Sequence, residues 1–139
     1  MVKKIDYLVS NGRANTALNI IGNSQNIKSP YTDALYYGFF DTFIKNQKNI
    51  TKQQLDEYYQ LSYENQKLFY QKYPYRTRIY LSQLAHIASK AINPDIKIDD
   101  QDVENAQEII NTTKKYNLKQ PELDFFYIQI LLNSTNSKD

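Results

Sequence analysis

Few side chains in this 139-residue sequence can do chemistry, because it has one histidine and no cysteine. Without cysteine there is no thiolate nucleophile and no Cys-containing zinc or iron–sulfur site, and one histidine excludes a multi-histidine metal site within the chain. His86 lies among Leu84, Ala85, Ile87 and Ala88, with no evident partner for general acid–base work. We expect it to be a structural or surface residue, and we expect no catalytic residue in the chain.

An acidic stretch formed by Asp95, Asp99, Asp100 and Asp102 is the second candidate. Its carboxylates could hold a hard cation, but the spacing lacks the glycine and the terminal glutamate of a calcium loop. Asp99 or Asp100 stands where a helix is expected to begin, and aspartate is a favoured N-cap. We therefore interpret these residues as helix caps and predict neither a metal nor a cofactor.

The third candidate is a binding surface that contains Tyr73, Tyr75, Arg76, Arg78 and Tyr80. Two of the chain's three arginines lie here beside three tyrosines. These residue types are enriched in binding hot spots, and they also stack on bases or sugar rings. Packing plus solvated charge is the alternative interpretation, since positions two apart on a helix diverge.

The elements that would position these residues are expected to be helices. The chain is 41% hydrophobic and 23% charged with a net charge of +2, values typical of one folded domain without a strong electrostatic preference for nucleic acid. It has only three glycines, at positions 12, 22 and 38, whereas hairpins and phosphate loops depend on glycine. The N-terminal segment lacks a signal-peptide core, and no window is apolar enough to span a membrane.

Helical periodicity and proline breaks divide the chain into segments. Ser29-Pro30 and Gln120-Pro121 are predicted helix starts, Thr51 begins a capping box, and Asn117 is a predicted left-handed stop. In the last helix we expect Leu123, Phe126, Tyr127, Ile130 and Leu131 to face inward, and in the helix from residue 75 we expect Ala91 and Ile92 to belong to the apolar stripe. The predicted helices are residues 3–9, 14–21, 30–47, 51–72, 75–92, 99–116 and 121–132.

Helix-opening prolines recur at Pro30, Pro74 and Pro121, roughly 45 residues apart, and each interval contains two helices. This predicts an all-α fold in which antiparallel helical hairpins stack as a short TPR-like α-solenoid of about six or seven helices. A plain helical bundle is the alternative. We expect residues 1–28 to form short helices packed on the repeats, residues 29–132 to form the repeat region, and residues 133–139 to be a frayed tail.

Two features of the sequence resemble known families. The run from Tyr73-Pro74 to Ala85 resembles the helix-opening segment of tetratricopeptide-like repeats. Over residues 29–132, the order Ser29-Pro30-Tyr31, Tyr73-Pro74, residues 104–110 and Pro121-Glu122-Leu123 looks like the extracytoplasmic C-terminal repeat tail of bacterial O-antigen ligase/polymerase-like membrane proteins. The period exceeds the 34 residues of tetratricopeptide units, and the membrane part that holds the catalytic machinery of such ligases is absent. No catalytic residue is carried over.

The resemblance implies a non-enzymatic helical-repeat interaction or scaffold module of the bacterial cell envelope. Its partner would be a protein or the glycan-assembly machinery of a membrane-anchored parent chain, and its location would be extracytoplasmic. The alternative is a small cytosolic or phage-type helical protein that binds nucleic acid through a Lys/Arg/Tyr face, and a small hydrolase with a carboxylate pair is a third hypothesis. Steep salt dependence of binding would favour nucleic acid.

Overall fold

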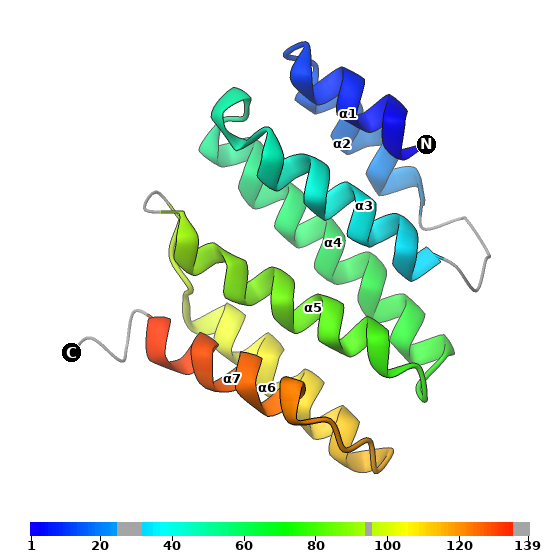
Figure 1. Cartoon of the computed structure of the whole chain (residues 1–139), viewed down its shortest axis with the longest axis vertical. Coiled ribbons are helices and arrows are strands. Elements are labelled where there is room, and N and C mark those ends of the chain that lie inside the picture. Colours follow the sequence, from blue (N-terminus) through cyan, green and yellow to red (C-terminus); the bar gives the residue numbers. More distant parts are fainter. Residues whose placement is uncertain (25–31, 94–95, 135–139) are drawn as a thin grey trace. The chain divides into compact units, whose positions relative to one another are not determined.

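The structure, a computed structural model, describes residues 1–24, 32–93 and 96–134 (Figure 1). Within these ranges the chain is helical, and its one extended pairing is an isolated bridge between Ile98 and Ser134. The predicted all-α class is confirmed. The α-helices are α1 Val2–Ser10, α2 Ala14–Asn23, α3 Thr32–Lys45, α4 Lys52–Lys72, α5 Thr77–Ser89, α6 Asp100–Lys115 and α7 Pro121–Asn133.

Local capping explains where several helices begin and end. Before α4, Thr51 and Gln54 form the predicted capping box, in which the Gln54 amide donates to the Thr51 hydroxyl and the Thr51 amide donates to the Gln54 side chain. Asp99 is the N-cap of α6, and Asn117, with φ 58°, follows the end of that helix in the left-handed region. Pro121 begins α7 as expected.

Four boundaries among the described residues differ from the prediction by two residues or more. Helix α2 continues to Asn23. Helix α3 ends at Lys45 and is followed by a separate 3₁₀ turn, Gln47–Asn49. Helix α5 begins at Thr77, because the residues after Pro74 form a turn, and a 3₁₀ segment, Lys90–Ile92, follows its end. Ser29-Pro30 lies outside the described residues.

The chain forms two compact units, Met1–Leu68 and Phe69–Asp139, whose boundary falls within α4. In the first unit α1 packs against α2 and α3, and the rings of Phe43 and Tyr58 stack with centroids 4.3 Å apart. Gly38 lets α1 approach α3 closely, since a Cβ there would lie 2.7 Å from a Val2 methyl carbon. The buried side chains of this unit include Ile5, Val9, Leu18, Ile21, Phe39, Phe43, Leu55 and Tyr58.

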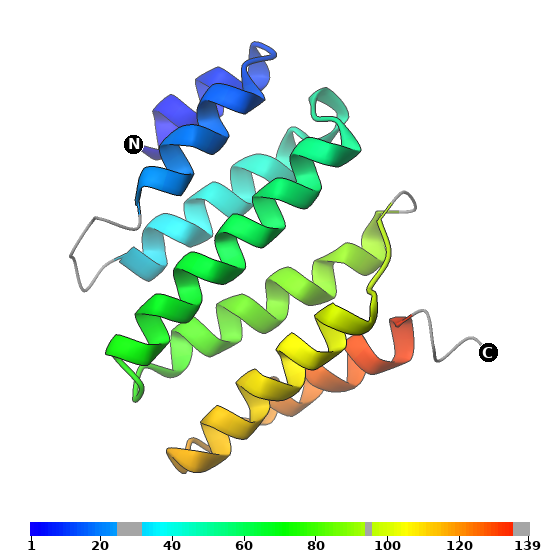
Figure 2. The same ribbon diagram turned by 180° about the vertical axis from the view of Figure 1, so that it is seen from behind.

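In the second unit α7 packs against both α5 and α6 (Figure 2). Its buried side chains include Ile79, Tyr80, Leu84, Ile87, Ile98, Ala106, Ile109, Ile110, Leu123 and Ile130. On α7, Phe126 and Tyr127 are half-buried. None of the described helices is long and apolar enough to cross a membrane.

Three residues predicted to face inward are exposed instead. Leu131 follows Ile130 by one position, about 100° around the helix, and falls outside the buried stripe defined by Leu123 and Ile130. Ala91 and Ile92 are exposed because regular α-helix stops at Ser89, and the tighter 3₁₀ turn rotates them away from the apolar stripe of α5. The stacking of the hairpins into a TPR-like solenoid stays a prediction.

Candidate binding surface

The turn between α4 and α5 carries most of the predicted surface residues. Tyr75 is 72% exposed and Tyr73 is half-buried. Arg76 is the half-buried N-cap of α5, and Arg78, the second residue of α5, is exposed. The turn forms because Pro74 disfavours helical geometry at Tyr73, which ends α4.

Tyr80 does not belong to this surface, which corrects the prediction. Its side chain is fully buried, with its ring centroid 5.0 Å from that of Tyr70. Its hydroxyl donates to the Pro74 carbonyl at 2.8 Å. Burial, aided by the neighbouring Tyr116, raises the pKa of Tyr80 to about 12. The neutral hydroxyl therefore ties the turn to α5. Tyr80 is a buried residue that fixes the position of the turn and does not itself belong to the surface.

Tyr116 joins the surface from a different helix. Its ring meets the Tyr75 ring edge to face, with centroids 5.2 Å apart. The ammonium of Lys115 lies 5.7 Å from the Tyr116 ring centroid, and that of Lys72 lies 5.5 Å from the Tyr73 centroid, both within cation–π range. We call these five residues, Lys72, Tyr73, Tyr75, Lys115 and Tyr116, the tyrosine–lysine surface.

The pairing of α5 with α6 explains why these residues meet. The beginning of α5 and the end of α6 lie at the same end of the second unit in both views (Figures 1 and 2). Lys114 and Lys115 lie in the last turn of α6, where positive charge also favours a helix C-terminus, so their presence alone does not indicate a binding surface. The sequence does contain one signal for this arrangement, the predicted left-handed stop at Asn117. If α5 and α6 form an antiparallel hairpin, a helix that ends at this stop ends beside the turn between α4 and α5.

Positive charge exceeds negative charge around the tyrosine–lysine surface. Arg76, Arg78 and Lys114 lie on its own elements, and the nearest acidic residues along the chain are Glu122, in the first turn of α7, and Glu108, seven positions before Lys115 on α6. The exposed Tyr75 ring offers flat apolar contact area, and the half-buried rings of Tyr73 and Tyr116 each lie near an ammonium group. Such an arrangement suits an acidic ligand that also presents apolar or planar groups.

His86 lies buried on α5, away from solvent. Burial lowers its pKa to about 3, so its imidazole is neutral near pH 7. Its neighbour Ser89 donates to the His86 backbone carbonyl at 2.6 Å. The structural interpretation of His86 therefore fits its position.

The acidic stretch acts at the N-terminus of α6. The Asp102 amide donates to the Asp99 side chain at 2.9 Å, and the Asp99 amide donates to the Asp102 carboxylate at 3.1 Å. Lys90 donates to Asp102 at 2.8 Å. Burial raises the pKa of the Asp102 carboxyl, and Lys90 opposes that shift. Capping by Asp99 is thus confirmed, whereas Asp95 lies outside the described residues.

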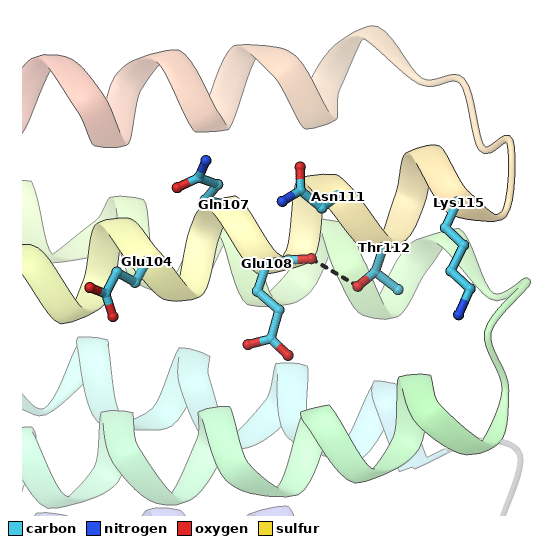
Figure 3. Close-up of a pocket in the computed structure, with 6 residues that line it drawn as sticks. All are labelled: Glu104, Gln107, Glu108, Asn111, Thr112 and Lys115. Carbon is cyan, nitrogen blue, oxygen red and sulfur yellow. Dashed lines mark hydrogen bonds between the residues drawn. The ribbon is translucent and has the colours of Figure 1, made fainter.

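A shallow depression of about 360 Å³ runs along α6 (Figure 3). The Thr112 hydroxyl donates to the Glu108 backbone carbonyl at 2.8 Å. All the lining side chains come from one face of this single helix, five of the six are exposed, and Figure 3 shows Glu104 and Lys115 on the same side of it. The lining residues are Glu104, Gln107, Glu108, Asn111, Thr112 and Lys115. This polar stripe lacks the convergence from several elements that a binding pocket shows.

Among the residues that the structure describes, no three acidic or histidine side chains gather closely enough to hold a metal ion. Comparisons of the chain with protein-family models, with characterised proteins and with solved structures found no match. We therefore infer the function from the tyrosine–lysine surface.

Proposed function

We propose that this protein is a non-enzymatic helical interaction module that binds an acidic partner protein through the tyrosine–lysine surface. One observation supports the proposal most strongly: Tyr75 is largely exposed, yet Tyr116 from a different helix holds its ring edge to face. An exposed tyrosine ring held by a half-buried tyrosine from a separate element is typical of the aromatic anchors that dominate protein interfaces.

Preorganisation supports the same proposal. The Tyr80 hydroxyl holds the Pro74 carbonyl, and the paired rings of Tyr75 and Tyr116 restrict each other. A surface fixed in this way has less side-chain entropy to lose when a partner docks. Lysine and arginine around the rings would steer an acidic partner and raise the association rate at low salt.

The placement of the reactive side chains supports a scaffold role. His86 is buried and neutral near pH 7, and the Asp102 carboxylate is engaged by Lys90 and by the Asp99 amide. In the wider proposal, the module is the extracytoplasmic tail of an O-antigen ligase/polymerase-like protein and contacts the machinery of surface polysaccharide assembly. The upstream sequence of the natural gene tests that parentage: several encoded membrane spans would support it, and a complete gene that begins at Met1 would refute it.

Nucleic acid is the second candidate partner, because tyrosine rings beside lysines also suit stacked bases and phosphates. Phosphate contacts predict a steep fall in affinity between low and moderate salt. Protein partners that depend on aromatic anchors lose less affinity over the same range, since their contact is less dominated by counterion release.

Fluorescence anisotropy with a labelled peptide that alternates glutamate with tyrosine and with labelled oligothymidylate of equal charge separates the two candidates. We expect the peptide to bind more tightly at moderate salt, and Tyr75→Ala to weaken that binding about tenfold. Tyr7→Ala is the matched control, because Tyr7 is also an exposed tyrosine with lysines three and four positions before it, but on α1. Equal effects of both variants, or tighter binding of the oligothymidylate, would refute the proposal.

A further inference from the structure

Helix α7 presents a second, apolar surface on the side opposite its packed residues. Leu123 and Ile130 hold the helix in the core of the second unit, and the bridge between Ile98 and Ser134 secures its end. Facing outward, Phe125 is 58% exposed and Ile128 is 53% exposed. Leu131 is 37% exposed and Leu132 is 68% exposed. We call these four residues, Phe125, Ile128, Leu131 and Leu132, the α7 face.

The α7 face is continuous because of its spacing. Positions 125, 128 and 132 follow the i, i+3, i+7 rule that places side chains on one side of a helix. At about 200 Å² for each large side chain, the exposed fractions add to roughly 400 Å² of apolar surface. Contiguous apolar patches of this size on soluble proteins are often interaction sites.

We propose that the α7 face binds a second copy of this chain, with the two α7 helices antiparallel about a two-fold axis at Ile128. The area fits this occupant, because a standard interface buries about 800 Å² on each partner and slightly more than half of that is apolar. Any other partner would need an apolar surface of similar size to cover the α7 face. A second copy of the chain has such a surface, because it carries the same α7 face.

The order of residues along α7 makes the face self-complementary. Phe125 stands three positions before Ile128 and Leu132 four positions after it, on the same side of the helix. An antiparallel copy would therefore pack each Phe125 ring against Leu132 of the other chain, while Ile128 meets its own copy. Such an isologous contact closes as a dimer and leaves no open end for further growth.

Asp124 determines the direction of the pairing. It is exposed near the start of the α7 face, beside Glu122 in the first turn of the helix. Parallel helices would place the two Asp124 carboxylates next to each other, whereas antiparallel helices separate them by eight residues, about 12 Å along the axis. Charge repulsion thus favours the antiparallel dimer.

A cysteine at the two-fold axis tests this geometry, because the chain has no cysteine of its own. Packed helices lie about 8–10 Å apart and have Cα radii of about 2.3 Å, so facing Cα atoms approach to roughly 4–5 Å, near the range that a disulfide bridges. Mild oxidation should convert Ile128→Cys to a covalent dimer and leave Tyr7→Cys, exposed on α1, largely uncrosslinked. Equal crosslinking of the two variants, or none in either, would overturn the proposal.

Light scattering after size-exclusion chromatography measures the association without a crosslink. We expect the unmodified protein to dimerise as its concentration rises, and Ile128→Glu to raise the dimer dissociation constant about a hundredfold, because two like charges meet at the axis. Tyr7→Glu should dimerise normally, and circular dichroism should show both variants folded. An unmodified protein that stays monomeric would overturn the proposal and assign the α7 face to a different partner. Neither result bears on the tyrosine–lysine surface, so the two proposals succeed or fail separately.

Discussion

Replacing His86 with leucine is expected to remove a large part of the chain's acid sensitivity. In the folded state burial lowers the histidine pKa to about 3, whereas an unfolded chain titrates near pH 6.5. As the pH falls below about 6.5, the unfolded state binds a proton that the folded state does not. The contribution of neutral His86 to stability is therefore present above pH 6.5 and is lost progressively towards pH 3.

The two pKa values set the magnitude. Linkage gives a loss of about 1.4 kcal/mol at about pH 5.5 and about 2.7 kcal/mol at about pH 4.5, relative to neutral pH. The full shift corresponds to about 4 to 5 kcal/mol. Because small domains are stabilised by only about 5–15 kcal/mol, such a loss alone would bring the second unit close to unfolding in acid.

Urea denaturation followed by circular dichroism gives the free energy of unfolding. We would measure it at several pH values for the unmodified chain and for His86→Leu. Carboxyl groups titrate equally in the two proteins, so they cancel in the difference between the unmodified chain and His86→Leu. That difference should shift by about 2 to 3 kcal/mol in favour of the variant between about pH 7 and about pH 4.5. Parallel pH profiles would show that His86 is accessible to protons in the folded protein, contrary to this expectation.

Three further changes test the local structure by thermal or urea unfolding. Asp99→Ala removes the N-cap of α6 and should cost about 1 kcal/mol; no loss would mean that the cap is not formed. Gly38→Ala should destabilise the first unit by about 1 kcal/mol or more, and Val2→Ala should restore stability in the double variant because it removes the contacting methyl groups. Asn117→Gly should stabilise the chain by up to about 1 kcal/mol, since φ is 58° there; a loss would contradict the left-handed geometry.

Much of the fold could be predicted because its signals are local. Thr51 with Gln54 and Pro121 mark helix starts through hydrogen bonds or ring geometry within one turn, and Asn117 marks a stop in the same way. The boundaries of α5 were harder to predict. The turn before α5 is tied by the Tyr80 hydroxyl to the Pro74 carbonyl, and the 3₁₀ segment after it contacts α6 through Lys90 and Asp102, and no local pattern marks either contact.

The candidate surface could be predicted only in part. Tyr73 and Tyr75 follow from the sequence because they flank a turn-forming proline. Tyr80 and Tyr116 do not, since a tyrosine's ring and hydroxyl suit both a core and a surface, and only the packing of α6 beside α5 decides which residue is buried. The exposure of Leu131 likewise depends on which side of α7 meets the rest of the unit.

The proposal that the tyrosine–lysine surface binds an acidic partner is tested by a nuclear magnetic resonance titration of the labelled protein with the peptide that alternates glutamate with tyrosine. We expect chemical shifts to move mainly at Tyr73, Tyr75 and Tyr116, and we expect Tyr75→Ala to reduce all of these changes while Tyr7→Ala leaves them intact. Shift changes centred on another surface, or none at saturating peptide, would contradict the proposal.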